Sequence, residues 1–263
     1  MEFTRFLDCL AADYDRLRSA VEADADAPVP TCPGWTVADL TRHVGEVYLH
    51  KTLAMSEGVE AEPWPPKEFA EEEPVALLDR GYTALRAEFA TRAPKDPAAG
   101  WYAADRSVGF WIRRMAQETV VHRIDAELAV GRPVAPVPDD LAVDGVDELL
   151  KVFVSFAVAE WGDYFGEILD ASPGRTFLVR AGGTAWRVRT GPGEFTVTDG
   201  AGEGPADATL SGPPEAVLPA LEPDGRRRGR RRDRRGRSRG RRGTAALRRR
   251  RHPVTGGAGV RRR

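Results

Sequence analysis

Hydrophobic residues in the first 160 positions recur every three or four places, which is the spacing of amphipathic helices that bury one face. One apolar stripe covers residues 3–21, a second covers 36–56 and a third covers 74–91. The segment PVPTCPGW separates the first two stripes, because its prolines and its Pro-Gly step cannot continue a helix. Thr36 is the predicted N-cap of the second helix, with Asp39 in the capping-box position.

Two more helices are predicted in the next stretch of the chain. The fourth ends at Gly131 and Pro133, which are helix-stopping residues. A single inward row of this helix contains Trp111, Met115, Glu118, His122 and Ala126. The fifth is predicted from Pro138 to about Trp161 and is more apolar in its second half. A Pro- and Glu-rich stretch, residues 58–74, is expected to form an exposed crossover between the second and third helices.

After Pro173 the pattern changes to the alternation typical of strands. Three short strands are predicted, with turns at residues 182–183 and 191–193, followed by a fourth strand and the start of a helix. The fold class is therefore predicted as α+β: a helical bundle over residues 1–165 and a small α+β domain over 172–222. This second domain is predicted to be incomplete, because the pattern stops within a helix near Leu221.

Charge is distributed very unevenly along the chain. Residues 225–263 hold 19 of the 39 Lys and Arg residues, all of them Arg, and a single acidic residue, Asp233, so the remaining residues have a net charge of −19. A segment of this composition is predicted to be disordered. It could bind nucleic acid by neutralising phosphates. We favour the other interpretation, that a GC-rich gene read out of frame produces this Arg- and Gly-rich sequence.

Several classes of protein are excluded by composition. Cys9 and Cys32 form neither a CxxC pair nor the even, spaced set of a secreted disulfide fold. The N-terminus has no signal-peptide pattern, and no apolar run approaches 18 residues. A cytoplasmic protein without a membrane partner is expected.

Glu118 and His122 are the central candidates for chemistry. Residues at i and i+4 share a helix face, so one ion could reach both side chains. His43 falls in the apolar stripe of the second helix and could add a third ligand, leaving one position open as in catalytic zinc sites. Spacing alone leaves a second interpretation equally open, in which these are satisfied core residues.

Other polar residues near this row have weaker claims. Arg123 and Asp125 are candidates for substrate contact or for orienting a ligand imidazole. Arg113 and Arg114 are expected to lie on a solvated basic face. His50 is left out of the site, and Trp35 is interpreted as a packing residue.

The segments VPTCPGWTVADLTRHVGEVY and QETVVHRIDAELAVG resemble the mycothiol-dependent maleylpyruvate isomerase family. This resemblance implies a DinB-like four-helix metal-binding bundle followed by a small sterol-carrier-like α+β domain. It also implies a divalent metal, zinc, held by His43, Glu118 and His122, with mycothiol as cofactor. Members of the family continue the second domain beyond the position of Leu221, where this chain has its Arg-rich tail.

The expected function is a metal- and mycothiol-dependent isomerase or thiol transferase, acting on a small molecule together with a low-molecular-weight thiol. A zinc-bound thiolate would add to an activated double bond, allow rotation and then leave. The same ligands would also suit a zinc-dependent hydrolase. A third alternative is a nucleic-acid-binding or regulatory protein, which requires the tail to be genuine.

Overall fold

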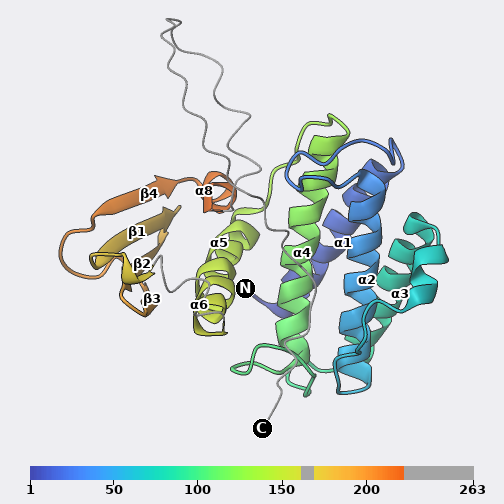
Figure 1. Ribbon diagram of the computed structural model, residues 1–263, viewed down its shortest axis with the longest axis horizontal. Helices are drawn as coiled ribbons and strands as arrows, with labels where there is room; N and C mark the ends of the chain where they lie inside the picture. The colour runs from blue at the N-terminus through green and yellow to red at the C-terminus, as the bar shows by residue number, and fades with distance from the viewer. Residues whose placement is uncertain (161–168, 222–263) are drawn as a thin grey trace, which may run out of the picture.

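The structure is a computed structural model that describes residues 1–160 and 169–221. The predicted disordered tail, 225–263, lies outside these residues, as does the predicted end of the fifth helix at Trp161. Figure 1 shows long helices at one end of the molecule and a small sheet at the other, with shorter helices between them. The fold class is α+β, as predicted.

Four long helices build the first layer: α1 (Phe3–Val21), α2 (Val37–Ser56), α3 (Pro74–Thr91) and α4 (Val108–Ala129). Helix α2 packs against both α3 and α4, and α1 packs against α4 (Figure 1). The capping box predicted at the start of α2 is confirmed, since Thr36 Oγ1 accepts from the Asp39 backbone N–H at 3.2 Å and Asp39 Oδ2 accepts from the Thr36 N–H at 2.8 Å.

Helices α2 and α3 approach each other closely at two glycines. A Cβ placed on Gly45 would lie 2.8 Å from the Leu78 backbone nitrogen, and one on Gly81 would lie 2.7 Å from the Gly45 carbonyl oxygen. Contacts this short are not tolerated, so only glycine allows this separation. The crossover before α3 contains a short 3-10 helix, η1 (Lys67–Glu71), which sequence analysis did not predict.

The fifth helix differs from the single helix predicted. It consists of α5 (Asp139–Glu148), a π-helical stretch η2 (Leu149–Val154) and α6 (Ser155–Glu160). Ser155 Oγ donates to the Leu150 carbonyl at 3.0 Å, five residues earlier. Leu150 packs in the core beside the sheet, whereas Val152 packs in the bundle core.

The four strands predicted along the chain are present and form one sheet. Strands β1 (Arg175–Ala181), β2 (Thr184–Gly191) and β3 (Glu194–Asp199) form an antiparallel meander, and β4 (Ala208–Gly212) pairs parallel to β1. The resulting order is β3-β2-β1-β4. Helix α8 (Pro214–Leu221) and α5 cover the sheet's apolar face. Within the residues described, no helix is both long and apolar enough to cross a membrane.

Candidate metal centre

His43, Glu118 and His122 come together between α2 and α4. The His43 Nε2 atom lies 3.4 Å from Glu118 Oε1, and His122 Nε2 lies 3.1 Å from the same oxygen. The two imidazole rings are nearly perpendicular, with centroids 5.2 Å apart. One ligand-type atom from each residue lies within 4.8 Å of the others. Two nitrogens and one carboxylate oxygen therefore lie close enough together for one ion to reach all three.

Solvent reaches this group only partly. The side chains of His43, Glu118 and His122 are 28%, 15% and 12% exposed. The Trp35 ring lies 5.0 Å from the His43 ring and packs against the bundle core, in agreement with a packing role. The group is thus accessible at its edge rather than sealed in the core.

Asp125 orients the imidazole of His122. Its Oδ2 atom lies 3.1 Å from His122 Nδ1, and its Oδ1 accepts a hydrogen bond from Thr31 Oγ1 at 2.6 Å. A carboxylate on one ring nitrogen directs the other nitrogen toward the group, which is the usual arrangement around ligand histidines. Sequence spacing suggested Asp125 for this place, but nothing in the sequence pointed to Thr31.

When no cation is bound, the charges around His122 favour the protonated form of its imidazole. Burial opposes ionisation of Glu118, but Arg114 and His122 outweigh it and hold the pKa of Glu118 well below its usual value. Burial also opposes the charged form of His122, yet Glu118 and Asp125 raise its pKa from 6.5 to about 9. The two carboxylates thus favour a positive charge on His122, and a metal ion bound by this imidazole would replace its proton.

Arg113 and Arg114 do not lie on a solvated face, so that prediction was wrong. Arg114 is only 9% exposed and pairs with both Glu118 and Glu148. Arg113 pairs with Asp144 at 2.9 Å and with Asp147 at 3.0 Å. The carboxylates of α5 cover this side of α4. The prediction failed because those partners are about 30 residues away in sequence.

Arg123 is fully buried, and a substrate contact from it is not supported. Its Nε donates to Asp13 at 2.9 Å, and its Nη1 donates to Glu127 at 3.0 Å and to the Ala135 carbonyl at 2.8 Å. Its side chain has no exposed surface, so a ligand from solvent cannot touch it. Although it follows His122 directly, helical geometry turns it toward α1.

Two further residues of α2 have partners outside the group. His50 contacts Trp64 edge to face, with ring centroids 4.9 Å apart, and Lys51 lies 4.7 Å from the centre of the Trp111 ring. Burial, with a smaller effect of Lys51, lowers the pKa of His50 to about 4. His50 stays outside the cluster, as the sequence interpretation assumed.

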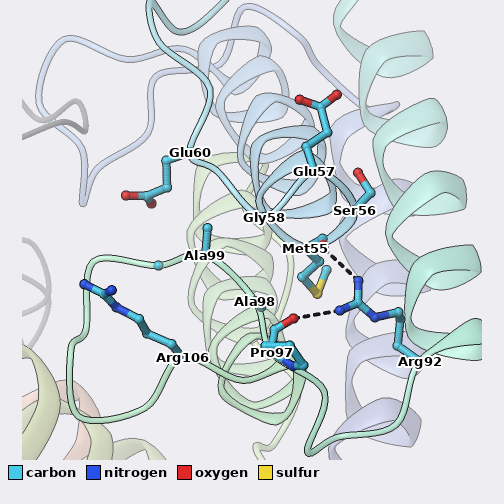
Figure 2. A pocket seen from close by; sticks show the side chains of 11 residues that line it. Met55, Ser56, Glu57, Gly58, Glu60, Arg92, Pro97, Ala98, Ala99 and Arg106 are labelled. Atoms are coloured by element: carbon cyan, nitrogen blue, oxygen red, sulfur yellow. Dashed lines mark hydrogen bonds between the residues drawn. The ribbon is translucent and has the colours of Figure 1, made fainter.

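A pocket of about 550 Å³ lies at the far end of α2, and it does not contain the metal-binding candidates. Figure 2 shows Arg92 crossing its wall to the carbonyls of Met55 and Pro97, at 2.6 and 2.7 Å. Glu60 lines this pocket and also lies 3.6 Å from Lys51. The candidate site is therefore the side-chain group between α2 and α4 rather than this opening.

Comparison with known proteins finds a family match for most of the helical part of the chain. Residues 7–127 match the family described as mycothiol maleylpyruvate isomerase N-terminal domain. A crystal structure of the mycothiol-dependent maleylpyruvate isomerase is similar in fold, with a TM-score of 0.53 and 12% identity over 83% of this chain and 88% of that chain. A histidine-to-alanine mutant of the mycothiol-dependent isomerase gives the same TM-score at 11% identity over the same shares. No curated protein matches.

Proposed function

From the match of residues 7–127 to the mycothiol maleylpyruvate isomerase N-terminal domain, we propose that this chain is a metal- and mycothiol-dependent isomerase or thiol transferase. The observation that carries the proposal is the convergence of His43, Glu118 and His122 between α2 and α4. This group lies within the matched residues. The substrate is proposed to be a small molecule with an activated double bond.

The donor atoms fit a zinc ion. Two imidazole nitrogens and one carboxylate oxygen are the ligands of several catalytic zinc sites, which keep a fourth position open. The separations of 3.1 and 3.4 Å between their atoms are near the ~3.4 Å expected for neighbouring ligands at tetrahedral zinc. When bound there, a divalent cation would lower the pKa of a thiol, so that the nucleophilic thiolate forms near neutral pH.

The residues around the group would prepare this site. Asp125 fixes the ring of His122, and Thr31 fixes Asp125. Glu118 offsets one unit of positive charge, so a site with two neutral imidazoles keeps net positive charge that attracts an anionic sulfur.

The proposed reaction needs no nucleophile from the chain, because the small thiol supplies it. Its thiolate sulfur would bond to one carbon of the double bond, and the π electrons would move onto the activating group, so that the former double bond could rotate. Return of those electrons would re-form the double bond in the trans arrangement and expel the thiolate. A thiol transferase would use the same first step, but a proton would then add to the other carbon and the adduct would be kept.

The decisive experiment removes a proposed ligand. His122→Ala should abolish both zinc retention and thiol-dependent turnover, whereas Glu118→Gln should weaken zinc binding less, since the amide oxygen can still coordinate. His50→Gln is the matched control, because His50 lies outside the group. The measurement is zinc stoichiometry beside an isomerisation assay with and without mycothiol. Full zinc occupancy in His122→Ala would reject the ligand assignment, and turnover without thiol would favour hydrolysis.

A further inference from the structure

We propose that Glu148, acting through Arg114, is a positioning residue that leaves only one oxygen of Glu118 available to a metal ion. The inference rests on the proposed metal centre and goes beyond it, because Glu148 lies on α5, outside the residues that match the family. It assigns a purpose to a buried charge that the ligand set does not use.

The two oxygens of Glu118 face different partners. Oε1 is the atom that approaches both imidazoles, at 3.4 Å from His43 Nε2 and 3.1 Å from His122 Nε2. Oε2 instead accepts a short hydrogen bond from Arg114 Nη2. A carboxylate divided in this way can offer one oxygen to a cation while the other stays on the guanidinium.

Arg114 is held in place by contacts on both sides. Its Nη1 donates to Glu148 Oε2 at 2.9 Å, and its guanidinium lies 4.7 Å from the centre of the Phe153 ring. The planar guanidinium presents its donors in a rigid fork, so fixing one arm on Glu148 fixes the arm on Glu118. Glu148 thereby sets the orientation of a residue that it does not touch.

The Glu148 carboxyl group is buried and pairs with Arg114, as expected of a residue that fixes the guanidinium. Its side chain is only 4% exposed, and among the described residues its Oε1 has no hydrogen-bond partner. Burial raises its pKa to about 7, although Arg114 and Arg113 oppose this. Burying an acidic group in this way is unfavourable for folding unless its pairing compensates.

The consequence concerns the open coordination position. If both oxygens of Glu118 could bind the ion, the carboxylate would occupy the position that a thiol or substrate needs. With Oε2 held by Arg114, three protein atoms bind and the fourth position stays free, which is the arrangement of catalytic sites.

The test uses Co²⁺ as a spectroscopic replacement for zinc in the full-length protein. Glu148→Met removes the anchor at similar volume, and should weaken Co²⁺ binding by about 10- to 100-fold. It should also reduce the visible absorption of the bound ion. Once Arg114 is no longer fixed, Oε2 of Glu118 can also bind the ion and raise its coordination number. Glu148→Gln, which retains an acceptor, should fall between. Asp144→Ala is the control, because it breaks an ion pair of the same helix with Arg113.

A second variant keeps the proposal testable if Glu148→Met does not fold. Arg114→Lys retains the charge but lacks the rigid fork that fixes one donor on each carboxylate, so it should change the spectrum in the same direction. Combining it with Glu148→Gln should add little further loss, because both act through one contact. Unchanged Co²⁺ affinity and spectrum in folded Glu148 and Arg114 variants would overturn the inference alone. If the parent protein binds no Co²⁺, the proposed metal centre fails instead.

Discussion

His122 and Arg123 are neighbours on α4, but they lie in two charged regions that differ in their exposure to solvent. His122 belongs to a group with Glu118 and His43 whose edge is open to solvent. Arg123 belongs to a network with Asp13 and Glu127 in which its own side chain has no exposure. Both regions contain ionisable groups at helical spacing. Only the open region lets a ligand replace the contacts among its members, and so only there does the pattern suggest binding.

The largest expected effect comes from breaking the sealed region. Arg123→Ala should lower the free energy of unfolding by about 3–5 kcal/mol, because Asp13 and Glu127 would remain buried without their partner. Urea unfolding followed by circular dichroism measures this. The folded fraction should still bind zinc with the parent affinity. A loss below about 1 kcal/mol would show that the network is not a structural anchor.

Breaking the support of the open region should affect binding more than folding. Asp125→Ala removes the carboxylate from His122 Nδ1, and should weaken zinc binding by about 10- to 100-fold. Competition with a chromophoric chelator measures the affinity. If the affinity stayed within twofold of the parent, the orientation of His122 would not depend on Asp125.

His50, a histidine outside both regions, gives a pH-dependent effect. Its pKa is about 4 in the folded protein against 6.5 ordinarily, so between these values the unfolded chain binds a proton that the folded chain does not. Stability should therefore fall as pH drops from 6.5 to 4. His50→Gln should flatten this part of the stability curve, as followed by thermal unfolding at several pH values. A curve parallel to that of the parent would contradict the assigned environment.

The smallest effect is expected at the rim of the sealed region. Arg16 also pairs with Glu127 at 3.0 Å, but its side chain is half exposed. Arg16→Ala should change the free energy of unfolding by less than about 1 kcal/mol, because solvent screens an exposed pair. The same urea titration compares it directly with Arg123→Ala, and equal losses from both variants would remove the distinction between rim and core.

Local rules predicted most of the fold. Apolar stripes located α1 to α4, the Thr36 and Asp39 pair fixed the start of α2, and glycine turns separated the strands. The meeting of His43 with Glu118 and His122 also followed from inward positions on two neighbouring helices. These features depend on residues close in sequence or on a shared apolar face.

The rest depended on contacts between distant segments. Arg114 is an ordinary exposed arginine by sequence, and only the packing of α5 supplies Glu148 as its partner. Arg123 likewise finds Asp13 on α1, 110 residues earlier. The π-helical stretch η2 was missed because its apolar residues would suit a regular helix equally well.

The π-helical stretch η2 contributes residues to both hydrophobic cores, and this has a consequence for how the molecule unfolds. Leu150 and Val152 are separated by one residue, yet one belongs to the core beside the sheet and the other to the bundle core. Detaching the sheet would expose apolar surface next to a residue that the bundle needs. The helical bundle and the sheet domain should therefore unfold in a single cooperative transition, rather than in two separate ones.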